Sequence, residues 1–170
     1  TIKNTLPINT AHFLAFGVSD TKQFHFDLKT FFNERGELKD LEQQISRVSS
    51  NAGIDLERDL KNLWGKEFAV VQLASQEKFV IIQATNGSKL NFLLEPISTS
   101  RSDNVRRFNN SNILYYYFGT PLKEFSRPFY AVIDNYLVIA NTVSTVQQVL
   151  NNYTLEKTLS KEAEFRKFNQ

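Results

Sequence analysis

The side chains that most often perform chemistry in proteins are scarce in this sequence. His12 and His25 are the only histidines, and cysteine is absent. Histidine acts as a general base or a metal ligand when a carboxylate, a serine or a second histidine lies within reach. Neither residue belongs to a His-x-x-x-His pair or a Ser-His-Asp arrangement in the sequence. We therefore interpret both as ordinary packed or surface histidines, while a partner distant in sequence stays open.

An acidic cluster is the next group with the right residue types. Asp55, Glu57 and Asp59 have the D-x-E-x-D spacing of some cation-binding loops. Such loops also need a glycine at the bend and a later bidentate acid. Here the surrounding apolar residues recur at helical spacing, and Gly65 follows them. The pattern predicts a helix over 55–64, capped by Asp55 and ended by Gly65, and no metal site.

A group of arginines could bind phosphate or carboxylate groups. Arg101, Arg106 and Arg107 lie in the polar stretch 97–111. Guanidinium groups recognise such anions through paired hydrogen bonds. The stretch lacks the glycine-rich backbone that many phosphate sites use, so we expect a solvated loop with at most an edge strand.

Aromatic side chains form the fourth candidate site. The segment 112–118, NILYYYF, has the composition of a strand. Alternate residues of a strand point to opposite faces, so Tyr116 and Phe118 would share one face. An open face with these two residues would suit a sugar or another small ligand. The other interpretation is that both faces of this strand are covered.

Two similar segments are expected to build the framework around these residues. Residues 66–95 and 127–152 each contain an apolar run, a polar turn, a second apolar run and a helical pattern. Each predicts a β-hairpin followed by a helix. Asp134 and Asn135 form the tighter turn, because both residue types tolerate a positive φ angle.

The remaining elements complete an α+β pattern. Residues 11–18 predict a strand, and residues 21–34 and 37–50 predict amphipathic helices. We predict one α+β domain over 1–170, with an antiparallel sheet of about six strands and helices mainly on one face.

The first hairpin suggests a docking surface. We place Phe68, Val70, Phe79 and Ile81 together on the face that also carries two glutamines. A half-solvated sheet should be more polar on its open face. We therefore predict that these four residues dock another domain, a protein partner or a ligand.

Bulk composition removes several classes of protein. The 170 residues carry a net charge of +2, with Lys and Arg scattered, which argues against a dedicated nucleic-acid binder. No apolar run approaches the ~20 residues that span a bilayer. Because the chain starts at Thr1 without Met and stops inside a helical pattern over 161–170, we expect a fragment of a longer protein.

Three stretches carry a resemblance to a known family. They are GIDLERDLKNLWGKEFAVVQL, PFYAVIDNYLVIAN and TLSKEAEFRKF. In the first, the matching positions are Gly53, Ile54, Asp55, Asp59, Leu60, Gly65, Glu67 and Ala69. From Leu6 to Phe168 the chain resembles a family of bacterial exported proteins classed as a domain of unknown function.

The resemblance implies a location but no site residues. Members are secreted or anchored envelope proteins, so it implies an extracytoplasmic location and allows a lipid anchor outside this chain. Taken together, we predict a non-enzymatic envelope module that packs against another domain or a protein partner, without a cofactor. The alternative is a small-ligand or glycan-binding domain that uses Tyr116 and Phe118.

Overall fold

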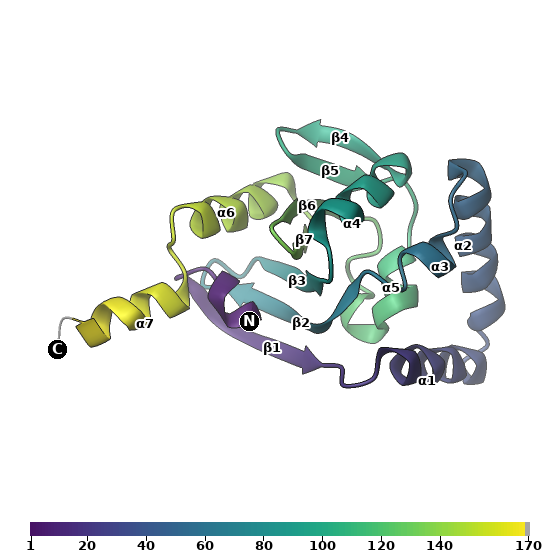
Figure 1. Ribbon diagram of the computed structural model, residues 1–170, viewed down its shortest axis with the longest axis horizontal. Helices are drawn as coiled ribbons and strands as arrows, with labels where there is room; N and C mark the ends of the chain where they lie inside the picture. The colour runs from purple at the N-terminus through teal and green to yellow at the C-terminus, as the bar shows by residue number, and fades with distance from the viewer. Residues whose placement is uncertain (169–170) are drawn as a thin grey trace.

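Residues 1–168, which the computed structural model describes, adopt an α+β fold around one open antiparallel sheet (Figure 1). The strand order is β1-β2-β3-β7-β6-β5-β4. The strands are β1 Thr10–Gly17, β2 Trp64–Leu73, β3 Lys78–Ala84, β4 Ser98–Ser102, β5 Val105–Phe108, β6 Phe129–Ile133 and β7 Tyr136–Ala140. The α+β prediction is confirmed, with seven strands in the described residues where about six were expected. The stretch 97–111, expected to be mainly loop, forms the hairpin β4–β5.

The helices follow the predicted pattern in most places. The α-helices are α1 Thr21–Glu34, α2 Leu38–Ala52, α3 Leu56–Asp59, α4 Gly87–Leu94, α5 Ile113–Phe118, α6 Val143–Thr154 and α7 Leu159–Phe168. Short 3₁₀ turns are η1 Ile2–Thr5, η2 Glu95–Ile97 and η3 Thr120–Leu122. Of the helical pattern expected over 161–170, residues 169 and 170 lie outside the described residues. None of the described helices is both long enough and apolar enough to cross a bilayer.

The two predicted hairpin-helix units meet at the centre of the sheet. Hairpin β2–β3 leads into α4, hairpin β6–β7 leads into α6, and β3 pairs with β7. The side chains of Asn86 and Thr142 cap the two helices by accepting backbone N–H bonds. A Cβ atom on Gly87 would overlap the Asp134 carbonyl, so glycine permits the start of α4 to lie against the β6–β7 turn.

Apolar side chains are buried on both faces of the sheet. One face, which we call the helix-rich face, packs against α1, α2, α3, α4 and α5. The opposite face packs against α6, η1 and the first residues of α7. Helices therefore lie mainly on one face, as predicted, but the other face is also largely covered.

The prediction that Phe68, Val70, Phe79 and Ile81 share a face is wrong. Phe68 pairs with Ile82 and Ala69 pairs with Ile81, so Phe68 and Val70 lie on the helix-rich face. Phe79 and Ile81 lie on the opposite face. The cause is the turn, in which Gln76 has a positive φ of 79° and Leu73 bonds back to Glu77. A register change of one residue inverts every side chain of a strand.

Two further local predictions are wrong. Residues 113–118 form the helix α5 instead of a strand, and all six side chains are buried. The helix expected over 55–64 is confirmed only at its start, where Asp55 accepts a bond from the Arg58 N–H. It ends at Asp59, and Gly65 lies in β2. A side chain at Gly65 would approach the Gln83 carbonyl to 2.8 Å, so close strand contact explains this glycine better than a helix cap.

Candidate functional site

Strand β1 forms one border of the sheet and is unusually exposed. β2 lies on one side of it, and no described strand lies on the other. Leu14 is 62% exposed and Phe13 is 36% exposed. The strand sequence TAHFLAFG contains no charged residue and no proline. Charged residues and prolines are common devices that prevent edge strands from pairing with other chains.

The free edge of β1 presents a row of backbone donors and acceptors. The Val18 N–H donates to the Lys66 carbonyl at 2.7 Å, which fixes the alternation of the ladder. Counting back along the antiparallel pair, Phe16 and Leu14 direct their backbone groups to β2. Phe13, Ala15 and Gly17 therefore direct their N–H and C=O groups outward, where no described residue pairs with them.

An apolar groove of about 590 Å³ runs beside this edge on the helix-rich face. Its floor contains Leu14 and Phe16 from β1 and Val70 from β2. Pro121, at the turn after α5, lies on its far wall. An exposed ion pair of 3.7 Å between Lys78 and Glu124 borders the groove.

The structure separates the four residues predicted to dock a partner. Phe68, Phe79 and Ile81 are fully buried, and only Val70 reaches the groove. The sequence interpretation missed Phe13 and Leu14. The signal that could have identified them is a strand of eight residues with no charge on either face.

The aromatic residues predicted to bind a ligand are also buried. Tyr116 and Phe118 are each 5% exposed. The Phe118 ring lies 5.0 Å from both the Trp64 and the Phe68 rings. These residues therefore form the packed layer between the sheet and the outer helices, and no aromatic platform is open there.

The tyrosine hydroxyls of α5 bind the start of α2 and the helix α3. Tyr115 donates to Glu37 at 2.7 Å, Tyr116 to Glu57 at 2.8 Å and Tyr117 to the Leu56 carbonyl at 2.8 Å. Burial raises the pKa of the Tyr116 and Tyr117 phenols, and Glu57 adds to it through its hydrogen bond to Tyr116 and through its charge near Tyr117. Both phenols are therefore neutral donors at neutral pH.

His25 lies beside this cluster. Its ring packs edge-on against Tyr117 at 6.1 Å, and its Nε2 atom is buried without a hydrogen-bond partner. Burial lowers the pKa of His25, and the positive charges of Lys61 and Lys29 act in the same direction. Neither His25 nor the exposed His12 bonds a carboxylate or a serine within the described residues.

Most of the polar candidates have structural partners, whereas Arg101 is exposed without one among the described residues. Asp55 caps α3, and Glu57 pairs with Lys29 at 3.2 Å. Arg106 donates to the Ser98 hydroxyl at 2.8 Å, and Arg107 lies over the Phe129 ring at 4.7 Å. Among the side chains that the structure describes, no group of three or more His, Asp or Glu residues could hold a metal ion.

Comparison with known proteins adds no relative to these observations. No protein-family model, no curated protein and no solved structure matches this chain. The resemblance to exported bacterial proteins therefore stays a prediction, and the functional argument depends on the geometry of the molecule.

Proposed function

We propose that this chain is a non-enzymatic interaction module of the bacterial envelope that binds an extended strand of a neighbouring domain or partner protein along β1. The observation that supports the proposal is the uncharged, exposed edge of β1. A strand is the ligand that such an edge selects, because it can pair with the outward backbone groups of Phe13, Ala15 and Gly17.

The side chains next to the edge define what the strand should contain. A strand laid against β1 places alternate side chains on the two faces of the sheet. Those on the helix-rich face would lie beside Leu14, at the mouth of the apolar groove. Those on the opposite face would lie beside Phe13. We therefore propose a partner strand that is mainly apolar and carries no charge opposite the centre of β1.

Without a bound partner strand, the edge of β1 stays exposed to water. An exposed apolar strand with free backbone groups is a template for uncontrolled association. A specific partner strand covers the same surface in one defined register. The glycan-binding alternative through Tyr116 and Phe118 has no such support, because both rings are buried between the sheet and the outer helices.

The proposal can be tested with peptides selected from a library of extended sequences displayed on phage. The selected peptides should share an apolar, uncharged centre. Binding should slow hydrogen exchange at the amides of Phe13, Ala15 and Gly17. Leu14→Lys should abolish binding, since it places a charge at the mouth of the groove.

A matched control is available just after α6. Leu155 is 64% exposed, close to the 62% of Leu14, but it follows the last residue of α6. Leu155→Lys should leave peptide binding unchanged. Unaltered exchange at the β1 amides, or equal effects of the two lysine variants, would contradict the proposal.

A further inference from the structure

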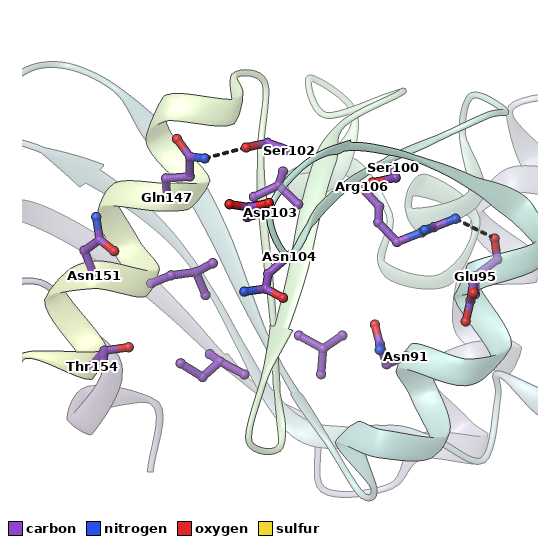
Figure 2. A pocket seen from close by; sticks show the side chains of 14 residues that line it. Asn91, Glu95, Ser100, Ser102, Asp103, Asn104, Arg106, Gln147, Asn151 and Thr154 are labelled. Carbon is purple, nitrogen blue, oxygen red and sulfur yellow. Dashed lines mark hydrogen bonds between the residues drawn. The ribbon is translucent and has the colours of Figure 1, made fainter.

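A second cleft lies at the far side of the sheet from β1. It has a volume of about 920 Å³ and is bounded by α4, α6, the β4–β5 turn and the end of β6 (Figure 2). Pockets for small ligands fall in the range of about 300–1,000 Å³. The space is therefore large enough for a ligand of several hydrogen-bonding groups.

The cleft exists because two neighbouring strands separate. β5 pairs with β6 only at Arg106–Tyr130 and Arg107–Phe129, whereas β6 continues to Ile133. The Phe108 N–H bonds the Pro128 carbonyl, and the same alternation directs the backbone groups of Val132 into the cleft. This edge therefore offers the backbone groups of one residue, which is too short for an added strand.

Three carboxamide side chains line the cleft from different elements. Asn91 lies on α4, Asn104 in the β4–β5 turn and Asn151 on α6, and in the view of Figure 2 Asn104 lies between the other two. None of the three side chains has a hydrogen-bond partner among the described residues. Each can donate and accept at once.

The walls that carry these groups are fixed by two hydrogen bonds. Gln147 donates to the Ser102 hydroxyl at 2.8 Å, which connects α6 with β4. Arg106 donates to the Glu95 carbonyl at 3.2 Å, which connects β5 with η2. A cleft with rigid walls loses less conformational entropy when a ligand binds.

The charges of the lining disfavour anions. Glu95 and Asp103 contribute two carboxylates, and Arg106 is the single cation among the residues that line the cleft. The Arg106 guanidinium already donates to Ser98 and to the Glu95 carbonyl. A phosphate or carboxylate ligand would therefore meet two like charges and one cation, whose Nε and Nη2 groups already donate to the protein.

We propose that this cleft binds a neutral ligand rich in hydroxyl groups, such as a mono- or oligosaccharide. A hydroxyl group donates and accepts, as the three carboxamides do, and it can also donate to the two carboxylates. The apolar side chains of Val132 on one face of β6, and of Ile133 and Leu150 on the other, give the walls surfaces for the C–H groups of a sugar. The site is independent of strand binding at β1.

A titration followed by NMR tests the proposal with defined probes. Glucose, N-acetylglucosamine and maltose represent neutral sugars, glucose 6-phosphate and glucuronate represent anionic ones, and trialanine represents a peptide. Millimolar neutral sugar should shift the amide signals of Asn104, Val132 and Asn151. The anionic sugars should bind more weakly than glucose.

Two variants and one control assign binding to the cleft. Asn151→Ala and Asn91→Ala should each weaken binding of the best neutral sugar about fivefold, the effect of one lost hydrogen bond. Asn51→Ala changes an exposed asparagine of α2 outside the cleft and should have no effect. Asn104 is left unchanged, because its φ of 62° makes most replacements strained.

Three results would overturn the proposal. They are the absence of shifts with every neutral sugar, stronger binding of trialanine or an anionic sugar, and equal effects of the three alanine variants. Unfolding temperatures of the variants should match that of the parent chain, which separates loss of binding from loss of folding.

Discussion

Two apolar segments of this chain differ in how far the rest of the chain buries them. α5, with the sequence ILYYYF, is surrounded on every side, whereas β1, with the sequence TAHFLAFG, is exposed along most of its length. Composition suggested the first as a surface for a small ligand or sugar, as the alternative to docking through the first hairpin. In the structure it is the second that is exposed. Apolar content shows that burial of a segment is favourable. The topology of the fold decides whether other parts of the same chain bury it.

The largest expected effect comes from truncating one leucine in α5 and one in β1 and comparing the losses of stability. Leu114 in α5 is 2% exposed, and Leu14 in β1 is 62% exposed. Leu114→Ala should cost about 2–5 kcal/mol of unfolding free energy, because it removes buried contacts and leaves a cavity. Leu14→Ala should cost less than about 0.5 kcal/mol. Urea unfolding measures both, and similar values would show that β1 is as well packed as α5.

A smaller effect should follow from the hydroxyl of Tyr117. It donates to the Leu56 carbonyl and so joins α5 to α3. Tyr117→Phe should cost about 1 kcal/mol, since that carbonyl keeps its bond from the Leu60 N–H. Tyr116→Phe should cost less, because the Glu57 carboxylate keeps Lys29 and partial access to water. The opposite order in urea unfolding would contradict this ranking.

The layer around α5 should also respond to pH. Burial lowers the pKa of His25 in the folded protein below its usual value of 6.5. Below pH 6.5 the unfolded chain therefore binds more protons than the folded protein does. The free energy of unfolding decreases as the pH falls through that range. His25→Phe should remove this contribution.

His12→Gln is the control for that measurement. His12 lies on the exposed strand β1, outside the α5 layer. The variant should keep the decrease below pH 6.5. An unchanged pH profile after His25→Phe would show that other groups cause the acid sensitivity.

The smallest effect on stability is expected at β1 itself. Phe13→Lys should change the unfolding free energy by less than about 0.5 kcal/mol, because the side chain can reach water. It should nevertheless reduce self-association at high protein concentration, since a charged edge strand pairs poorly. Light scattering compares the variant with the parent chain. Equal scattering would mean that the edge is less adhesive than its sequence indicates.

The sequence predicted most of the framework for identifiable reasons. The β6–β7 hairpin was clear because Asp134 and Asn135 form a two-residue turn, and Asp134 does have a positive φ of 50°. Asn86 and Thr142 are strong capping residues, and the helices after them begin as expected. Local rules decide these features, so a single sequence is sufficient.

The candidate sites were harder to predict because they depend on non-local geometry. Which side chains of β2 and β3 share a face depends on the length of the turn near Gln76, and a difference of one residue reverses the result. For α5, strand-forming side chains adopt a helix between Asn112 and Gly119, where burial on all sides overrides local preference. The polar cleft depends on where β5 leaves β6, and no local pattern indicates that point.

The central pairing of β3 with β7 also has a consequence for how the chain can fold. Ile81 pairs with Val138, so the middle of the sheet joins positions that are far apart in the sequence. Such non-local strand pairs form slowly, because the entropy of closing a long loop is lost before any stabilising contact forms. During synthesis, hairpin β2–β3 emerges first and keeps an apolar strand edge unpaired until residue 140 has been made. A ribosome that stalls before Tyr136 would hold a nascent chain in which β3 is paired with β2 alone and its other edge is free.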